Sequence, residues 1–329
     1  MTLQNKTVLV TGAGGFLGSH LAERLVKEGA RVRALIHYNA RTSAGWLDHS
    51  SLADDMEIMA GDICDPASCE TAASGCDIVY HLAALTSVPY SYRSPASFVR
   101  TNIDGTLCML EAARRGRVER FVQASSSQTY GTARAIPIKE DHPLQAQSPY
   151  AATKIACDSL ADAWRRTYGV PVSILKVFCT FGPRQSVRNV IPTIITQLLE
   201  GPSVKLGNLT PRRDYNYVDD AIDAYVSAAT ASDALGATLN ICGQTEISIA
   251  DLARLIARLM GCELNIERDD ARVRPEGSEV DRLLGDPSLA QKLLGWKHKV
   301  GLEDGLEKTI AWYREHKSLV VPATKAGFI

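Results

Sequence analysis

A glycine-rich stretch near the start of the chain, residues 11–18, limits most strongly what this sequence can fold into. It follows an apolar, β-branched run at residues 7–10 and opens a pattern of apolar residues at helical spacing. In such a strand–turn–helix unit, the first glycine permits a tight turn, the second lets a pyrophosphate approach the backbone, and the third lets the helix pack closely on the strand. The stretch therefore predicts a dinucleotide-binding loop at a helix N-terminus. Its predicted cofactor residues are Gly12, Gly15, Phe16, Leu17 and Gly18.

The first half of the chain alternates strand-like and helix-like segments, which predicts a Rossmann-type, doubly wound α/β fold with a parallel sheet. We expect strands at residues 7–11, 32–36, 57–60, 78–81, 120–124 and 173–177, and helices at 16–28, 67–73, 97–114 and 150–168. Glycine and proline become frequent after Phe181, where we expect a second lobe to begin. We expect a helix at 218–229 and a strand at 238–242 to return to the sheet. The expected division is a dinucleotide-binding domain of residues 1–180 plus about 214–243, and a smaller C-terminal α/β substrate lobe of residues 181–213 and 244–329.

Composition narrows the classes of partner. The net charge of −1 gives no electrostatic reason to expect a nucleic-acid or membrane partner. No apolar run approaches the roughly 20 residues of a membrane span, and the first residues lack the apolar core of a signal peptide. The eight cysteines are scattered without a CxxC pair, which is typical of free thiols in a reducing compartment and predicts no metal site. We therefore expect a cytoplasmic protein.

The end of the second strand bears on the choice of cofactor. In NAD-binding folds an acidic residue there accepts hydrogen bonds from the ribose hydroxyls. In this chain the position falls near Ile36, which has no carboxylate, and His37, Asn39 and Arg41 surround it. Because His37 or Arg41 could pair with a 2′-phosphate, both NAD and NADP remain open at this point.

The segment after the third strand, Asp62 and Ile63, is placed to meet an adenine. An ordinary turn or helix-capping role is the alternative interpretation of Asp62.

Tyr150 and Lys154 lie four residues apart at the start of a predicted helix, so they share a face. A lysine ammonium beside a phenol favours the phenolate, which can act as a base toward a hydroxyl while a hydride leaves the same carbon. Tyr and Lys at this spacing also occur on solvated helix faces. Here, however, a serine-rich strand end at residues 125–127 precedes them, and one of its hydroxyls could bind the same substrate oxygen.

Together these motifs resemble the extended short-chain dehydrogenase/reductase family, whose members act on nucleotide-activated sugars. The similarity covers nearly the whole chain and is closest to bacterial 4,6-dehydratases of the legionaminic-acid type. The resemblance to the family is carried by residues 11–18, 81–84, 102, 126, 150, 154, 181–184, 213–220 and 274–276. The closer resemblance to the legionaminic-acid type is carried by residues 38–39, 45–48, 137–154, 182–197 and 274–286.

The resemblance implies roles for particular residues. Ser126, Tyr150 and Lys154 would form the oxidation triad, in which Tyr150 takes the proton of the sugar 4-hydroxyl and Lys154 also holds the nicotinamide ribose. A homodimer built on the helices at 97–114 and 150–168 is also implied. The implied partner is a nucleotide-diphosphate sugar. Its implied contacts are Thr86, Ser87, Cys179, Asn189, Arg213 and Arg274, and the implied cofactor contacts include Leu82, Ala83 and Ala84.

Several of these residues have alternative interpretations. Thr86 and Ser87 could instead belong to a capped, packed loop, and each arginine could form a surface ion pair. Cys179 stands where the family usually has an asparagine that touches the sugar nucleotide. A reactive thiol is one interpretation of Cys179, and a buried inert thiol is the preferred one.

A second departure concerns the reaction itself. In 4,6-dehydratases the strand end carries a glutamate that acts as the base at sugar C5, whereas this chain reads Ser126, Ser127, Gln128. An amide cannot accept that proton. A 4-epimerase needs no such base, so we predict an NAD(P)-dependent nucleotide-sugar 4-epimerase with a tightly bound, recycled cofactor. The alternatives are a 4,6-dehydratase with its base elsewhere, a 4-keto reductase or dehydrogenase that exchanges its cofactor, and a non-catalytic cofactor-binding protein.

Overall fold

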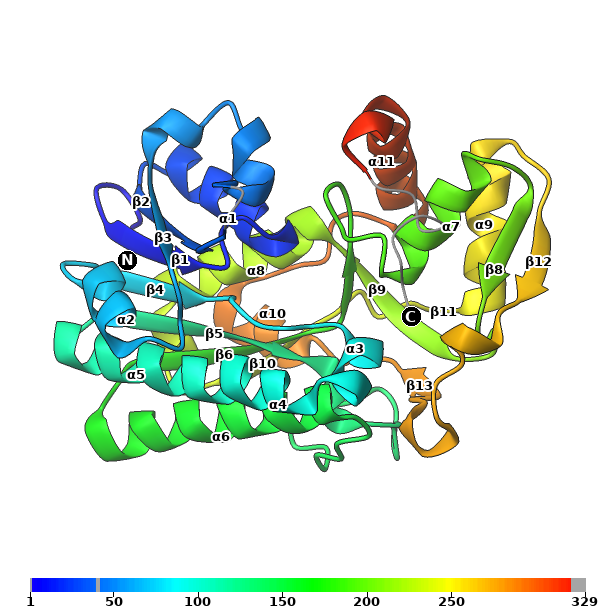
Figure 1. Ribbon diagram of the computed structural model, residues 1–329. Coiled ribbons are helices and arrows are strands. Elements are labelled where there is room, and N and C mark those ends of the chain that lie inside the picture. The colour runs from blue at the N-terminus through cyan, green and yellow to red at the C-terminus, as the bar shows by residue number, and fades with distance from the viewer. Residues whose placement is uncertain (1, 40–41, 321–329) are drawn as a thin grey trace.

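The computed structural model describes residues 2–39 and 42–320 and is built on a seven-stranded parallel sheet (Figure 1). Side chains alternate across it: Val8 and Val10 of the first strand enter one core cluster and Leu9 enters the other. Because both faces are covered, the central strands at 7–11 and 78–81 are apolar and buried almost throughout, whereas the edge strand at 56–61 is largely exposed. In spatial order the strands are β10 (Thr238–Ile241), β6 (Val172–Val177), β5 (Arg120–Ser126), β4 (Ile78–His81), β1 (Thr7–Thr11), β2 (Arg31–His37) and β3 (Met56–Gly61).

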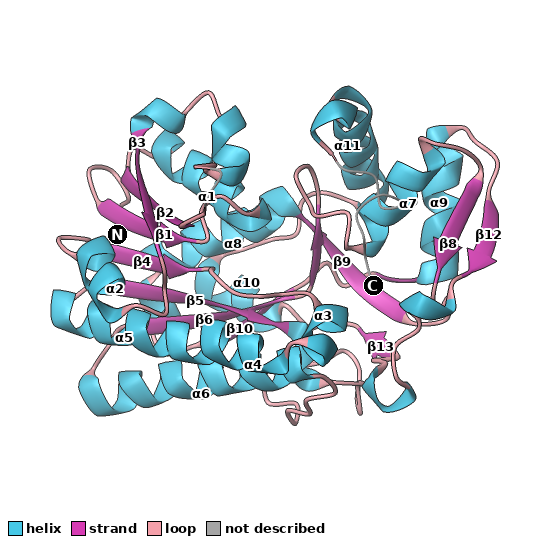
Figure 2. Ribbon diagram, viewed as in Figure 1, coloured by secondary structure: helices cyan, strands magenta, loops and turns pink. Residues whose placement is uncertain are grey.

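Helices pack on both faces of this sheet (Figure 2). One face carries α1 (Phe16–Lys27), α8 (Val218–Thr230) and α10 (Ser288–Leu294), and the other carries α2 (Pro66–Ala73), α5 (Gly105–Gly116) and α6 (Pro149–Tyr168). The ends of α6 follow from its sequence. Ser148 Oγ accepts a hydrogen bond from the N–H of Ala151, Pro149 occupies the first turn, and Gly169 ends the helix with φ +72°.

The structure confirms the predicted doubly wound α/β fold, and strands 7–11 and 78–81 begin and end as predicted. The helix expected at 97–114 is present, but it is not a uniform α-helix. A short α4 (Pro95–Phe98) leads through a π-helical segment (Val99–Asp104) into α5. The reason is tertiary, because Asn102 in the π segment turns inward. Its side chain bonds both backbone groups of Leu85, at 2.8 and 3.1 Å, and Thr153 Oγ1 at 2.9 Å.

The smaller lobe surrounds β9 (Arg212–Tyr217), which pairs with β7 (Cys179–Phe181), β11 (Glu246–Ser248) and β13 (Arg282–Leu283). Beside it lies a two-stranded sheet of β8 (Ser203–Leu206) and β12 (Asn265–Arg268), with α7 (Val190–Leu198), α9 (Ile249–Met260) and α11 (Leu302–Glu315) packed together. The remaining helix is α3 (Val88–Arg93), which follows β4. The chain returns to the parallel sheet through α8 and β10.

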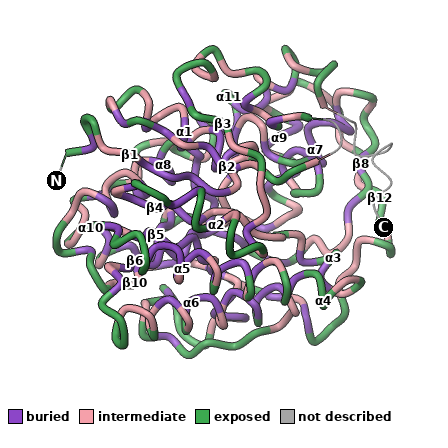
Figure 3. Tube along the Cα trace, turned by 60° about the vertical axis from the view of Figure 1, so that its left-hand side comes forward, coloured by how far each residue is buried: buried purple, intermediate pink, exposed green. Residues whose placement is uncertain are grey.

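Figure 3 shows that buried residues follow the parallel strands and the inner sides of the helices. Among the described residues, none of the helices has both the length and the apolar character needed to cross a bilayer. The strand order reverses between β1 and β4. In open α/β sheets such a reversal opens a crevice at the carboxyl ends of the strands. The glycine loop after β1 and the loop after β4 both start at this point.

Candidate active site

The glycine loop leaves no room for side chains where it turns. Gly12 has φ +69°, and a Cβ on it would lie 2.9 Å from Ala83 Cα. A Cβ on Gly18 would lie only 2.1 Å from the carbonyl oxygen of Gly12. Helix α1 starts after Gly15, and none of the described side chains caps its first turn. The first-turn N–H groups of a helix have no partner within the helix. The loop thus forms a close-approach cradle that fits a dinucleotide pyrophosphate.

Thr11 and His81 connect the loops that follow β1 and β4. Thr11 Oγ1 accepts hydrogen bonds from the N–H groups of Leu82 (3.1 Å) and Ala83 (3.0 Å). With both lone pairs used, its own proton goes to His81 Nδ1, 2.9 Å away. His81 therefore carries its proton on Nε2 and donates it to Thr106 Oγ1 at 3.2 Å. Burial, together with the nearby Lys154 charge, lowers the pKa of His81 to about 3.

This neutral histidine predicts an acid-side loss of stability. Between pH 6.5 and about 3 the unfolded chain binds a proton at His81 that the folded chain does not. The free energy of unfolding therefore falls as pH drops, by about 1.4 kcal/mol per unit once the unfolded histidine is protonated. In His81→Gln we expect the free energy of unfolding to fall between pH 7 and pH 5 by about 1–2 kcal/mol less than in wild type, measured by urea unfolding. His49→Gln is the control, because His49 is exposed. An equal decrease in wild type, His81→Gln and His49→Gln would refute the assignment.

The residues after β2 and β3 form tightly bonded turns. His37 is exposed, and the Asn39 amide donates to the carbonyls of His37 (3.1 Å) and Ser43 (3.0 Å). Arg41 lies outside the described residues. Asp62 accepts the N–H of Cys64 at 2.9 Å, so the turn role weighed for it is present, and Ile63 is buried against Gly105.

Helix α6, which carries Tyr150 and Lys154, packs against β5 and against the turn after it, where Ser126 lies. Tyr150 and Lys154 are both buried on α6. Lys154 Nζ donates to the carbonyl of Ala124 at 2.8 Å, two residues before Ser126. The Tyr150 ring meets Phe98 edge-on, with 6.3 Å between the ring centroids.

Ser126, Ser127 and Gln128 form one turn at this strand end. Ser126 Oγ accepts the N–H of Gln128 at 3.2 Å, Ser127 is buried, and Gln128 is half-buried. Asn102 was named from the sequence without an assigned role. Its side chain bonds Leu85 in the loop after β4 and Thr153 on α6, next to Lys154. Asn102 therefore connects the loop after β4, its own π segment and α6, which are distant in sequence.

Arg213 and Arg274 lie together, and both contact Glu279. Arg213 Nη2 is 3.2 Å and Arg274 Nη1 is 3.6 Å from Glu279 Oε1, while Asn208 donates to Oε2 at 3.1 Å. Arg213 is buried on β9. Guanidinium pairs suit phosphate oxygens, and an anion bound here would share them with this carboxylate. Sequence reasoning missed Glu279, although it lies only five residues after Arg274 in the same loop.

The other proposed substrate residues differ in burial and in the hydrogen bonds that they make within the chain. Burial raises the pKa of Cys179, so a reactive thiolate is not favoured. Ser87 caps α3 by accepting the N–H of Tyr90, while Thr86 is exposed. Asn189 precedes α7, and its amide donates to the carbonyl of Ser186 at 3.3 Å.

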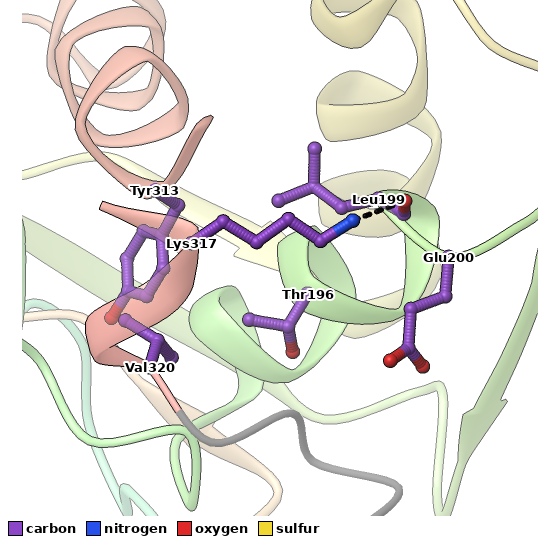
Figure 4. Close-up of a pocket in the computed structure, with 6 residues that line it drawn as sticks. All are labelled: Thr196, Leu199, Glu200, Tyr313, Lys317 and Val320. Atoms are coloured by element: carbon purple, nitrogen blue, oxygen red, sulfur yellow. Dashed lines mark hydrogen bonds between the residues drawn. The ribbon is translucent and has the colours of Figure 1, made fainter. Parts of the chain in front are cut away.

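A separate hollow lies between α7 and α11 (Figure 4). Lys317 Nζ extends across it and donates to the carbonyl of Leu199 at 3.3 Å. Its lining contains none of the triad residues, so we treat it as helix packing and not as a site of chemistry. The lining residues are Thr196, Leu199, Glu200, Tyr313, Lys317 and Val320.

Comparison with known proteins places this geometry in a family. Residues 9–309 match the family model described as GDP-mannose 4,6 dehydratase. The chain belongs to this family. Its members are NAD-dependent nucleotide-sugar dehydratases and epimerases of the extended short-chain dehydrogenase/reductase type, as the resemblance implied.

Relatives within this family include both reaction types. The chain is 35% identical over 326 residues to a dTDP-glucose 4,6-dehydratase of Streptomyces griseus, covering 97% of this chain and 98% of the relative. It superposes on the epimerase Mth375 of Methanothermobacter thermautotrophicus with a TM-score of 0.89 and 29% identity, covering 96% and 94% of the two chains. It also resembles a UDP-glucuronic acid 4-epimerase of Bacillus cereus, solved with UDP-glucuronic acid and NAD (TM-score 0.85, 29% identity, 94% and 99% coverage).

Proposed function

We propose that this family member is a nucleotide-sugar 4-epimerase. It oxidises the sugar at C4, the 4-keto sugar rotates in the site, and the hydride returns to its other face. The observation that carries the proposal is the strand end itself. Ser126 lies there, the helix that carries Tyr150 and Lys154 packs against it, and Gln128 stands where the resemblance implies a C5 base. A solved relative with NAD and a UDP-sugar bound supports NAD as the cofactor.

The chain's own groups supply binding and proton handling. NAD, when bound, takes up a hydride from the sugar carbon and returns it. Tyr150 accepts the 4-hydroxyl proton during oxidation and gives it back during reduction. Lys154 donates one N–H to the carbonyl of Ala124, which leaves two donors for a ribose hydroxyl. The Ser126 hydroxyl is placed to bind the same sugar oxygen.

Arg213 and Arg274 would bind the diphosphate of the nucleotide sugar. Both arginines already pair with Glu279. A bound diphosphate would therefore replace part of these ion pairs. This arrangement keeps two guanidinium groups oriented before the substrate arrives. Asn189 at the start of α7 is the proposed third contact.

Dehydration is the second candidate, and the full-length similarity to a 4,6-dehydratase favours it. Loss of water across C5 and C6 of a 4-keto sugar requires a base for the C5 proton. Gln128 cannot provide that base. The carboxylate buried beneath the strand end, Asp158, is already bonded to Ser125 and Lys176. The residues at this strand end therefore favour epimerisation.

The variant Gln128→Glu tests this distinction. If the amide alone blocks dehydration, the new carboxylate should raise formation of a 4-keto-6-deoxy product by about 10²-fold over wild type, the size of a general-base contribution. The product is followed by proton NMR in heavy water, with Gln128→Ala as the control that lacks a base. If wild type and both variants form the 4-keto-6-deoxy product at the same measurable rate, another group removes the proton.

We also propose that the lobe expected at residues 181–213 and 244–329 covers the sugar nucleotide, with the boundaries adjusted so that β7 and β9 belong wholly to it and α10 stays with the parallel sheet. We further propose a cytoplasmic homodimer. Helices α5 and α6 lie side by side and pack together (Figure 1). Leu107 on α5 is 36% exposed and suits such a contact. Leu110, in contrast, is fully buried in the chain's own core.

A further inference from the structure

A buried ionic network lies directly beneath the catalytic strand end. Asp158 Oδ2 accepts hydrogen bonds from Ser125 Oγ at 2.7 Å and from Lys176 Nζ at 2.8 Å. Ser125 and Lys176 are register partners on the parallel strands β5 and β6, so both side chains leave the sheet on the face covered by α6. The side chains of Asp158 and Lys176 are only 8% and 4% exposed.

The network continues to the backbone of Ser126. Lys176 Nζ also donates to Thr129 Oγ1 at 2.8 Å, and Thr129 Oγ1 donates to the carbonyl of Ser126 at 2.8 Å. The ammonium lies 5.0 Å from the centre of the Tyr130 ring, a cation–π contact. The turn that carries Ser126 is therefore held on both sides, at Ser125 before it and at Thr129 after it.

The same helix face carries the triad residues. Tyr150, Lys154 and Asp158 follow one another at intervals of four residues on α6. Lys154 holds the carbonyl of Ala124 and Asp158 holds the hydroxyl of Ser125, which are consecutive residues of β5. Any shift of β5 relative to Asp158 would therefore also move Ser126 relative to Tyr150.

We propose that Asp158 and Lys176 are positioning residues that fix the Ser126 turn relative to Tyr150 for oxidation at C4; this rests on the proposed function. Stability alone is a weak explanation for the pair. Asp158 Oδ1 is buried and finds no hydrogen-bond partner among the described residues. Burying two charges costs desolvation energy that a single contact often does not recover.

The test uses full-length protein with its retained cofactor and a sugar nucleotide deuterated at C4. Ser125→Ala removes one hydrogen bond to Asp158 and leaves the ion pair intact, so it is expected to fold. Asp158→Asn leaves Lys176 without its counter-charge. Asp162→Asn is the matched control one turn further along α6, where the carboxylate pairs with Arg165 and Arg166 at the surface. Turnover, KM, the C4 isotope effect, NAD content and thermal unfolding are measured for each.

We expect Ser125→Ala to lower kcat about tenfold and Asp158→Asn by up to about 10²-fold, with KM changed less than about twofold. The C4 isotope effect on kcat should rise in both variants, and Asp162→Asn should match wild type. Unchanged kcat and isotope effect in folded Ser125→Ala would overturn the positioning role. If wild type dehydrates, the proposed epimerisation fails, but the isotope test still holds because both reactions oxidise C4.

Discussion

Tyr150→Phe is expected to lower turnover by about 10²–10⁴-fold, the usual size of a general acid–base contribution. The substitution removes the phenolic oxygen and retains the ring that packs edge-on against Phe98. The fold, the retained NAD and the affinity for the sugar nucleotide should therefore stay close to wild type. Initial rates, cofactor content and calorimetric binding of a nucleoside diphosphate separate these effects.

Tyr168→Phe is the matched control for this experiment. Tyr168 lies at the other end of α6 and is 53% exposed, so loss of its hydroxyl should leave turnover unchanged. A decrease of less than about threefold in Tyr150→Phe would assign the proton transfer to a different group.

Gly18→Ala is expected to have the largest effect on cofactor retention. The added methyl group would lie 2.1 Å from the Gly12 carbonyl oxygen and 2.8 Å from Ala13 Cα. Both atoms belong to the backbone, so relief requires the glycine turn itself to move. We expect about 1–3 kcal/mol less stability, as in other overpacked sites, and protein that purifies with little NAD. Thermal unfolding with and without added NAD, together with cofactor release, measures both effects.

Gly201→Ala controls for the loss of a glycine, because no described atom beyond its two chain neighbours lies within 4 Å of a Cβ there. It should retain both stability and NAD. If Gly18→Ala purifies with as much NAD as this control, the glycine loop is not the cradle of the cofactor.

The parallel sheet was predictable because its central strands are buried on both faces and appear in the sequence as apolar runs. Strands β1 and β4 match their predicted ranges for this reason. The π-helical geometry before α5 was not predictable from periodicity. The π segment exists because Asn102 reaches Leu85 and Thr153, which local spacing does not reveal.

The residues of the site were likewise predictable only where they form a local sequence pattern. The glycine loop and the Tyr150–Lys154 spacing are local patterns, so the sequence predicted them. The Asp158–Lys176 pair depends on the register of β5 and β6, and the contacts of Glu279 depend on a loop meeting β9. One signal was present, because Asp158 continues the four-residue spacing of Tyr150 and Lys154.

The most direct test of the epimerase proposal uses the wild-type protein as purified, in heavy water, with UDP-, GDP-, CDP- and dTDP-sugars. Mass spectrometry and proton NMR follow the products without added cofactor. The proposal predicts an unchanged mass, an inverted C4 centre and no deuterium at C5. Loss of water with deuterium in the product would contradict it and would show that a group other than Gln128 serves as the C5 base.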